Sequence, residues 1–464
     1  MKHQQPLGDT PPEEFRKQLH ELADWIADFR QNIESLRVAP DDKPGAIRAQ
    51  LPPQPPEEGE PFEKILSDVD RLIVPGMVHW GHPMFLGYFG WTTTAPGIPT
   101  ELETLVIDWL RQWMHLPKDF DGVVYDTASV GVMHALAAAR EDAAPSTRKR
   151  GLVGAGAPVF RIYASEQAHS SAEKAAIALG LGEENVQRVP VDAEFRMDAA
   201  ALREMIAQDG QRNFQPLAVV ATVGTTSTAA VDPVPEIAKV CHENRMWLHI
   251  DGAYGAGFAI LPECKSLTDG WSDADSIVVN PHKSLFVPLD FSVLYVRNLE
   301  RLRRVFTLIP EYLRGDTVEA QKNYMDYGIQ LGRRFRALKA WVIWRSLGRT
   351  GMVARMREQI RLANLLARWI KTDDRFELAA PVSMGVVCFQ FVGGDQNEID
   401  RLNSQIVERI NAAGRAYLTQ TKLRGRTVMR IGLGNVLTTE QHLRDAWELI
   451  QKECSSAGSP MVRP

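Results

Sequence analysis

Between residues 158 and 297 the chain alternates short apolar runs with amphipathic segments, and this alternation restricts the possible folds more than any other feature. The apolar runs have the length of β-strands and occupy residues 158–165, 216–224, 246–251, 273–280 and 291–297. Residues 169–182 and 233–245 have apolar side chains at helical spacing. Apolar strands that alternate with amphipathic helices are typical of an α/β fold with a mainly parallel sheet.

The N-terminal segment has a different pattern, that of one long amphipathic helix followed by a linker. Its apolar residues recur in alternating steps of four and three, as in a heptad repeat: Phe15, Leu19, Leu22, Ile26, Phe29, Ile33 and Leu36. Seven prolines follow between residues 40 and 61, and such a linker is extended and semi-rigid. A helix on an extended arm does not fold back easily. Its apolar face could pack against a partner subunit or against the chain's own core, and both alternatives stay open.

The pattern changes again after residue 345. Two strand-like runs at residues 386–393 and 427–434 alternate with two helical segments, which predicts a small α+β domain. We therefore expect a helical N-terminal arm for dimerisation at residues 1–90, a large α/β domain at residues 91–345, and a small α+β domain at residues 346–464.

Composition and charge exclude several functional classes. The 464 residues carry 53 basic and 58 acidic side chains, and a net charge of −5 disfavours general binding of nucleic acids. No apolar run approaches the ~18–20 residues of a membrane span, and the N-terminus has no apolar signal core. Cys241, Cys264, Cys388 and Cys454 lie far apart without a CxxC pair, which argues against a disulfide scaffold or a zinc site. We expect a cytoplasmic protein with reduced thiols and no metal ion.

Residues with reactive side chains follow several of the predicted strands. Asp251 follows one strand in “HIDGAYGAG”, Lys283 follows another in “NPHKS”, and His169 follows a third at the start of a helix. Each has a commonplace explanation when taken alone: a helix-capping aspartate, a solvated lysine and a structural histidine. In a parallel α/β sheet, however, the three would meet at the edge formed by the carboxyl ends of the strands, where ligands bind.

This combination matches the needs of pyridoxal phosphate. The cofactor requires a lysine for its Schiff base, a carboxylate beside the pyridine nitrogen and a flat group against the ring. It also requires backbone N–H groups and hydroxyls at a helix N-terminus to hold its phosphate. The run “DTAS” at residues 126–129 offers such a terminus, although a simple helix cap explains it too.

The chain resembles the pyridoxal-phosphate-dependent group II decarboxylases, and most closely their aromatic L-amino-acid decarboxylase branch. The resemblance is carried by “EQAHSSAEKA”, “VATVGTTSTAAVDPVPEIAKVC”, “WLHIDGAYGAG”, “ADSIVVNPHKS” and “DYGIQLGRRFRALKAW”, and it extends over nearly the whole chain. It implies an aspartate aminotransferase-like fold (fold type I), pyridoxal 5′-phosphate as cofactor and a homodimer. The implied activity is that of a lyase that converts aromatic L-amino acids to amines and CO2.

The resemblance also assigns roles to single residues. Lys283 would hold the cofactor covalently, Asp251 would pair with the pyridine nitrogen, and His169 would stack on one face of the ring. The other cofactor-binding positions would be Ala128 and Ser129 at the phosphate, Asn280 and His282 nearby, Ala253 on the second ring face, and Thr226 close to Asp251.

Two further assignments concern proton transfer and the substrate. Tyr312, in “IPEYLRG”, matches the family's loop tyrosine that returns a proton to Cα, with an ordinary loop tyrosine as the alternative. Trp80, Tyr88 and Phe89 match the wall of the family's substrate pocket and suit a flat apolar side chain. Aromatic residues at such spacing are, however, more often part of a core.

The chain departs from the family pattern at several points. After Ile98 it is shorter than the pattern by about one long helix, where relatives reach into the neighbouring subunit's active site. Ser284 replaces an aromatic residue, and Val130, Gly131 and Gly252 are also unusual in their motifs. Three alternatives therefore stay open: oxidative decarboxylation to an aromatic acetaldehyde, decarboxylation of another amino acid, and a pseudoenzyme that binds the cofactor and assembles with partners.

Overall fold

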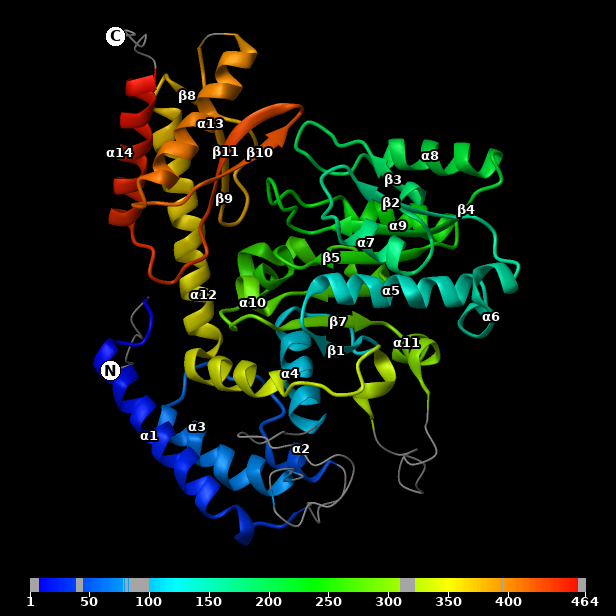
Figure 1. Cartoon of the computed structure of the whole chain (residues 1–464), viewed down its shortest axis with the longest axis vertical. Coiled ribbons are helices and arrows are strands. Elements are labelled where there is room, and N and C mark those ends of the chain that lie inside the picture. Colours follow the sequence, from blue (N-terminus) through cyan, green and yellow to red (C-terminus); the bar gives the residue numbers. More distant parts are fainter. Residues whose placement is uncertain are drawn as a thin grey trace.

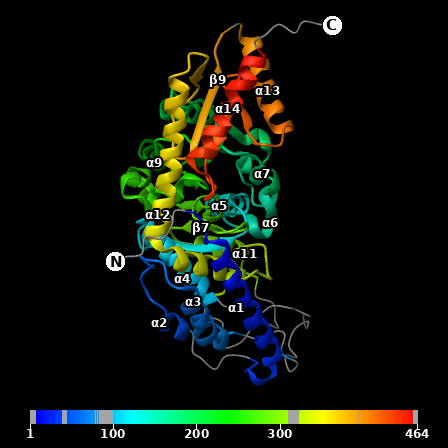
Figure 2. The ribbon, with the colours of Figure 1, turned by 90° about the vertical axis from the view of Figure 1, so that its left-hand side faces the viewer.

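The computed structural model describes residues 8–38, 45–77, 79, 82, 100–308, 322–393 and 395–457. Figure 1 shows three parts along the longest axis: a small sheet with the C-terminal helices at one end, a larger central sheet, and the N-terminal helices at the other end. Helix α12 (Arg336–Lys371) runs along one side and contacts all three parts, as Figure 2 shows from another direction.

Among the described residues, the central sheet contains seven strands in the order β1-β7-β6-β5-β4-β2-β3. Their bounds are β1 (Asp121–Tyr125), β2 (Phe160–Ser165), β3 (Val186–Val189), β4 (Gln215–Thr222), β5 (Trp247–Gly252), β6 (Ser276–Val279) and β7 (Ser292–Val296). Strand β7 runs antiparallel to both β1 and β6, and the other neighbouring pairs are parallel. All strands except β7 therefore share one direction, and the predicted mainly parallel α/β fold is confirmed.

Helices cover the central sheet. Helix α5 (Ala128–Ala143) crosses β4 to β7 and packs against α7 (Ser171–Ala178) and α11 (Leu299–Phe306). Helices α8 (Ala199–Gln211) and α9 (Val234–Glu243) pack against β4 and against each other. The short helix α6 (Thr147–Gly154) follows α5. Because helices cover its strands, the sheet is buried, and its strands read as continuous apolar runs in the sequence.

The C-terminal part forms a second, antiparallel sheet in the order β10-β11-β9-β8. Its strands are β8 (Phe376–Leu378), β9 (Val386–Phe391), β10 (Thr419–Leu423) and β11 (Arg426–Gly432). Helices α13 (Gln396–Ala412) and α14 (Glu440–Ala457) pack with the end of α12 over a core that includes Leu366, Phe389 and Trp447. The predicted small α+β unit at the C-terminal end is therefore observed.

The Pro-rich segment lies against a kink in α12, so the expectation of an arm that does not fold back is wrong. Gly348, with a φ of +62°, interrupts α12, and Figure 1 shows the helix changing direction there. A Cβ at this position would lie 2.3 Å from the carbonyl carbon of Glu58, so only glycine lets the segment approach. Backbone hydrogen bonds join the two: Glu60 N–H to Arg345 O (2.7 Å), Arg349 N–H to Pro56 O (3.0 Å) and Thr350 N–H to Glu57 O (3.0 Å).

Arg345 adds a charged contact between the same segments. Its side chain is 5% exposed and forms a two-point ion pair with Glu60, at 2.8 and 2.7 Å. A further guanidinium nitrogen lies 2.8 Å from the carboxylate of Asp68. The hydrogen bond from Arg345 lowers the pKa of Glu60 to about 2. A buried cation of this kind is stable only while its carboxylate partners remain in place.

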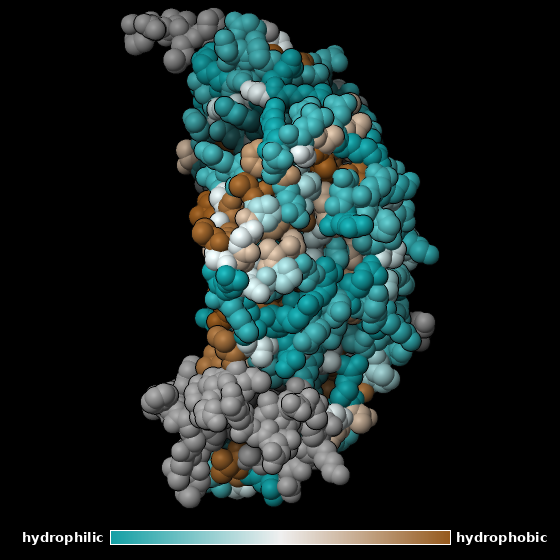
Figure 3. Space-filling model, turned by 90° about the vertical axis from the view of Figure 1, so that its right-hand side faces the viewer, coloured by the Kyte–Doolittle hydropathy of each residue, from teal (hydrophilic) through white to brown (hydrophobic). Residues whose placement is uncertain are grey.

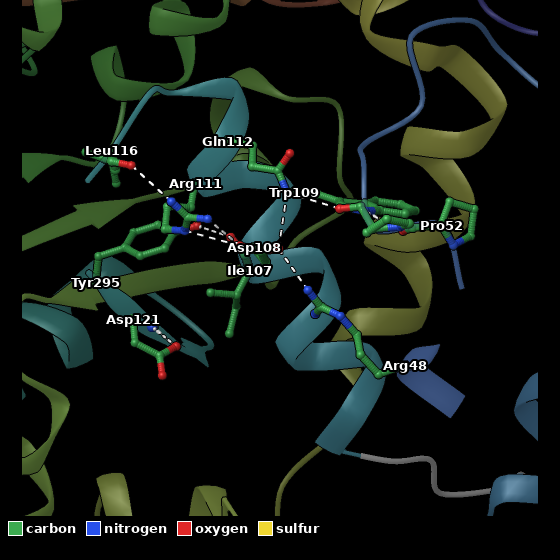
Figure 4. Close-up of polar contacts among 12 residues, drawn as sticks. Arg48, Pro52, Ile107, Asp108, Trp109, Arg111, Gln112, Leu116, Asp121 and Tyr295 are labelled. Atoms are coloured by element: carbon green, nitrogen blue, oxygen red, sulfur yellow. Dashed lines mark hydrogen bonds and ion pairs between the residues drawn. The ribbon is translucent and has the colours of Figure 1, made fainter. Parts of the chain in front are cut away.

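Helix α4 (Thr100–Trp113) provides a second surface for the arm, which Figure 4 shows in close-up. Asp108 of α4 accepts a hydrogen bond from Arg48 of α2 (Ala46–Gln50) at 2.8 Å. Two side chains of α4 donate to proline carbonyls: Trp109 to Pro52 (3.3 Å) and Gln112 to Pro53 (3.1 Å). Residues 48–53 are therefore held on α4 and residues 56–60 on α12.

Among the described residues, helix α1 (Pro12–Gln31) makes polar contacts with α3 (Phe62–Asp68) and with the residues just after it, and no residue of α1 is buried. Lys17 pairs with Glu63 of α3 at 2.7 Å, and the indole of Trp25 donates to Asp70 at 3.4 Å. The helix ends at Gln31, before the end of the predicted heptad pattern. Of the apolar residues in that pattern, Phe15, Leu19 and Ile26 stay 54%, 48% and 43% exposed.

None of the helices in the described ranges is long and apolar enough to cross a membrane. Within the same ranges, no three His, Cys, Asp or Glu side chains are grouped so that they could hold a metal ion. Figure 3 shows one face of the molecule as largely hydrophilic, with most of its hydrophobic residues along the left-hand edge of the view.

Replacing Arg345 by methionine should destabilise the protein by about 3 kcal/mol, because Glu60 and Asp68 would lose their cation at a partly buried position. Urea unfolding at pH 7 measures this loss. Arg357→Met on the same helix is the matched control, since Arg357 and Glu263 are both about half exposed and such pairs contribute ~0–1 kcal/mol. Equal losses in the two variants would contradict the prediction.

The same pair predicts a pH dependence. In the folded protein the pKa of Glu60 is lowered from 4.5 to about 2. Its stabilising contribution is therefore complete above pH 4.5 and disappears as the pH falls towards 2. The difference in unfolding free energy between the wild type and Arg345→Met should shrink over this interval.

Candidate active site

The residues predicted for the site follow the carboxyl ends of the parallel strands. Strand β1 runs in the same direction as β4 to β6, although β7 separates it from them. Helix α5 therefore starts beside the carboxyl ends of these strands. Figure 1 shows the first turn of α5 and the short helix α10 (Pro281–Ser284) at this same end of the sheet. The topology thus brings together segments that are far apart in the sequence.

Asp251 occupies the end of β5 and is 5% exposed. Its Oδ1 accepts a hydrogen bond from the backbone N–H of Ala253 at 3.1 Å. The carbonyl of Ala253 in turn accepts from the N–H of Asn280 at 3.2 Å, which joins the ends of β5 and β6. The side chain of Asn280 is buried, and its Oδ1 has no hydrogen-bond partner among the described residues. A buried polar atom without a partner at a sheet edge is a candidate ligand contact.

Lys283 follows in α10, where its backbone N–H donates to Asn280 O at 2.8 Å. Its side chain is exposed, and no carboxylate of the described residues forms an ion pair with it. The neighbouring His282 accepts a hydrogen bond at Nδ1 from the N–H of Phe291 at 2.9 Å. Burial, and to a smaller extent the charge of Lys283, lowers the pKa of His282. The lysine is therefore free for covalent chemistry, while the histidine supports the start of β7.

The first turn of α5 forms another part of the edge. Strand β1 ends at Tyr125, and α5 begins with Ala128 and Ser129. The N-cap residue is Thr127, whose side chain makes no capping hydrogen bond. The first N–H groups of this helix therefore remain available, and the helix dipole gives them partial positive charge. A phosphate group is favoured at such a position.

His169 and Thr226 follow β2 and β4, and both are exposed. His169 precedes α7, and its Nδ1 accepts a hydrogen bond from the N–H of Ser171 at 3.1 Å. Thr226 lies in the turn between β4 and α9, and its carbonyl accepts from Arg430 Nε at 3.0 Å. These hydrogen bonds hold His169 and Thr226 next to the carboxyl ends of β2 and β4.

Asp232 is a buried acid near the site that the sequence analysis missed. Its two carboxylate oxygens accept hydrogen bonds from the N–H groups of Met197 and Thr222, both at 2.7 Å. Burial raises the pKa of Asp232 to about 7 against the effect of these hydrogen bonds, and the charges of Asp192 and Asp251 raise it further. A single aspartate before a proline looks like a helix cap in the sequence, so no local signal identifies it.

The small C-terminal sheet borders the turn that contains Thr226. Besides Thr226, the carbonyl of Ser227 accepts from Arg430 at 3.1 Å, and the two hydroxyls of Ser227 and Thr421 lie 2.9 Å apart. The hydroxyl of Tyr254 accepts from the N–H of Gly385 at 3.3 Å. These contacts join residues about 130 to 200 positions apart, which no sequence spacing could indicate.

Unusually small residues in the family motifs have a packing explanation. A Cβ at Gly252 would lie 2.6 Å from the Cβ of Ala256, and one at Gly131 would lie 2.9 Å from Cγ2 of Val278. Ser284 is buried, with its Oγ 2.1 Å from the position of a Cβ at Gly257. An aromatic side chain at position 284 would therefore require this segment to move.

Four predicted site residues lie outside the described residues: Trp80, Tyr88, Phe89 and Tyr312. The pocket wall and the proton donor therefore stay predictions. For the remaining positions, the contacts above connect Asp251, Ala253, Asn280 and Lys283 in one continuous segment of the edge.

Comparisons with known proteins agree with this arrangement. Residues 88–392 match the family model described as “Pyridoxal-dependent decarboxylase conserved domain”. The chain is 33% identical to an aromatic-L-amino-acid decarboxylase of Catharanthus roseus, with 96% of this chain and 95% of that protein covered.

Solved structures agree as well. The structure of Oryza sativa TDC with PLP and tryptamine has a TM-score of 0.75 and 32% identity, and the match covers 98% of this chain and 100% of that chain. The 4-hydroxyphenylacetaldehyde synthase of Rhodiola rosea has a TM-score of 0.72 and 30% identity, with 97% and 100% covered. The chain is thus similar to both enzymes to nearly the same degree.

Proposed function

The chain belongs to the pyridoxal-dependent decarboxylase family, and from this premise we propose that it converts aromatic L-amino acids to the corresponding amines and CO2. Its family makes it an amino-acid decarboxylase that uses pyridoxal phosphate. The observation that carries the proposal is the sheet edge where Asp251, Asn280 and Lys283 follow neighbouring strands.

The residues at this edge fit the cofactor. The free N–H groups at Ala128 and Ser129 suit its phosphate, and the unpaired ammonium of Lys283 suits its aldehyde. The partnerless Oδ1 of Asn280 and the half-buried ring of His282 would line the space between them. We therefore assign these residues, with Ala253 and Thr226, to cofactor binding.

Bound pyridoxal phosphate supplies the electron sink that takes up the electron pair left at Cα when CO2 departs. In our proposal the Asp251 carboxylate holds a proton on the pyridine nitrogen, because a nearby anion stabilises that cation. His169 presents its flat ring to one side of the site, and the small side chain of Ala253 leaves room on the other. Tyr312 then delivers a proton to Cα as a general acid.

The preference for aromatic substrates is the finer part of the proposal. It is supported by the relatives, since one is an aromatic-L-amino-acid decarboxylase and one solved structure holds tryptamine. Trp80, Tyr88 and Phe89 would provide the apolar wall that a flat side chain needs. We find no motif that would bring an arginine to a substrate side-chain carboxylate.

The similarity to an aldehyde synthase makes a second product worth testing. On the same scaffold, one O2 can take two electrons from the electron-rich carbon after CO2 departs and become hydrogen peroxide, and one water then hydrolyses the oxidised C–N bond to release an aldehyde and ammonia. Tyr312 favours the amine, because a positioned proton donor shortens the time available to oxygen.

Borohydride reduction of the protein loaded with pyridoxal phosphate should attach the cofactor irreversibly to Lys283, as peptide mapping by mass spectrometry would show. The same preparation should release amines from phenylalanine, tyrosine, tryptophan or DOPA, measured by chromatography. Lys283→Arg should abolish both results. A label on another lysine would overturn the site assignment, and a label on Lys283 without turnover of any aromatic amino acid would favour a cofactor-binding pseudoenzyme.

Tyr312→Phe should separate the two reaction types. The change removes one hydroxyl, so cofactor binding should survive while protonation of Cα slows by ~10²–10⁴-fold. Amine formation should fall, and aldehyde and hydrogen peroxide should rise, which product analysis measures. Tyr327→Phe, at a half-buried position nearby in the sequence, is the matched control and should behave as wild type. Unchanged amine formation by Tyr312→Phe would redirect attention to His169.

We also propose that the protein is a homodimer, with the free face of α1 as part of the interface. This face exposes Phe15, Leu19 and Ile26, and it borders an apolar groove of about 660 Å³ between α1, α3 and α12. An exposed apolar stripe of this kind is typical of a protein–protein contact.

The double variant Leu19→Glu/Ile26→Glu should therefore be monomeric or much more weakly associated in analytical ultracentrifugation, because two carboxylates would enter an apolar contact. His20→Glu/Ala27→Glu introduces two glutamates at the same seven-residue spacing on a neighbouring face of α1 and should leave the association unchanged. A stable dimer of the first variant would exclude this face from the interface.

A further inference from the structure

Thr222, the last residue of β4, lies directly beside Asp251 on the neighbouring strand. The two residues are register partners in the parallel pairing of β4 with β5. Neighbouring strands lie about 4.8 Å apart, and register partners project to the same face of the sheet. Helix α5 covers this face, because Val278, the partner of Asp251 on β6, packs against Gly131 of α5.

The hydroxyl of Thr222 is a buried polar group without a partner. The residue is 4% exposed, and its Oγ1 makes no hydrogen bond with any described residue. Its backbone is held in place, since its N–H donates to Asp232 at 2.7 Å. Buried hydroxyls nearly always have a hydrogen-bond partner, so a partnerless one beside the central carboxylate indicates a functional role.

Asp251 can accept this hydroxyl. Among the described residues, only the N–H of Ala253 donates a hydrogen bond to the carboxylate of Asp251. An ionised carboxylate has about four acceptor positions. Positions therefore remain both for the pyridine nitrogen of the cofactor and for a neighbouring side chain.

His249, the other polar side chain near Asp251 on this face of the sheet, already has a hydrogen-bond partner. His249 lies two residues earlier on the same face of β5, with Nδ1 2.8 Å from Ser276 Oγ. The same oxygen accepts from the indole of Trp247 at 2.8 Å. Burial lowers the pKa of His249 to about 4, so its ring is neutral at pH 7 and brings no charge to Asp251.

We propose that Thr222 is a positioning residue of the decarboxylation: its hydroxyl, which makes no hydrogen bond in this structure, turns about the Cα–Cβ bond when the cofactor binds and donates to the Asp251 carboxylate of the neighbouring strand. This hydrogen bond would hold the carboxylate in the orientation that meets the pyridine nitrogen. This inference rests on the proposed cofactor site and adds a residue that touches neither cofactor nor substrate. Its effect passes through Asp251 alone. Removing the hydroxyl therefore weakens only the contact between the Asp251 carboxylate and the ring nitrogen of the cofactor. The other contacts of the cofactor are unaffected.

The test compares Thr222→Val, which keeps the shape and removes the hydroxyl, with Thr222→Ser, which keeps the hydroxyl. Dissociation constants are measured on the full-length apo-protein with two probes, pyridoxal phosphate and its analogue with C–H in place of the ring nitrogen. Thr222→Val should bind pyridoxal phosphate ~10–100-fold more weakly than the wild type, the range expected for one hydrogen bond to a charged group. It should bind the analogue as the wild type does, and Thr222→Ser should match the wild type with both probes.

Two controls separate positioning from a general loss of structure. Thr147→Val removes the hydroxyl of another threonine that is 4% exposed, at the start of α6, and should leave both dissociation constants unchanged. In an Asp251→Asn background, Thr222→Val should have no further effect on binding of pyridoxal phosphate. Thr222→Ala replaces the valine variant if that one does not fold, with the same expectations.

Two outcomes would overturn the inference: undiminished binding of pyridoxal phosphate by Thr222→Val, or equal losses for both probes. Wild-type protein that binds neither probe, or that attaches pyridoxal phosphate at a lysine other than Lys283, would instead refute the proposed function. The failure of the inference and the failure of the proposed function are therefore distinguishable.

Discussion

Parallel strands end at the same edge of a sheet, and the candidate site depends on this constraint. Strands β4, β5 and β6 place Thr222, Asp251 and Asn280 beside one another, and β1 delivers the start of α5 to the same edge. Just before the antiparallel β7, the N–H of Phe291 donates a hydrogen bond to His282, which ties the start of β7 to α10. Of the candidate cofactor-binding residues that the structure describes, Asp251 lies near the end of β5, His282 and Lys283 lie in the short helix α10, and the others lie in turns or at helix starts.

A second set of contacts holds the three parts of the molecule together. Gly348 lets the Pro-rich segment cross α12 at van der Waals distance, and Arg345 neutralises two carboxylates at this crossing. Proline carbonyls accept hydrogen bonds from α4, so the segment is held although proline offers no N–H group. One side of α1 is thereby presented away from its own core, and this gives the proposed homodimer its surface.

Overall similarity does not decide which product forms. The chain matches a decarboxylase and an aldehyde synthase with TM-scores of 0.75 and 0.72. Both reactions need the same electron sink and the same carboxylate, so the fold and the cofactor-binding residues are common to them. In our proposal the outcome depends on how quickly Cα receives a proton, a role that we assign to Tyr312.

The sequence by itself determined the α/β fold, the strand ends that carry Asp251 and Lys283, and the family, because these depend on local periodicity and on short motifs. The family resemblance also assigned Asn280, His282 and the start of α5 to the cofactor, and these assignments stay predictions. The sequence pattern misjudged the Pro-rich segment, since the docking on α12 depends on Gly348 and Arg345, nearly 300 residues away. Asp232, Arg430 and Thr222 escaped notice for the same reason. Their roles arise from register pairs and hydrogen bonds between distant segments, and only the tertiary structure decides which side chains those are.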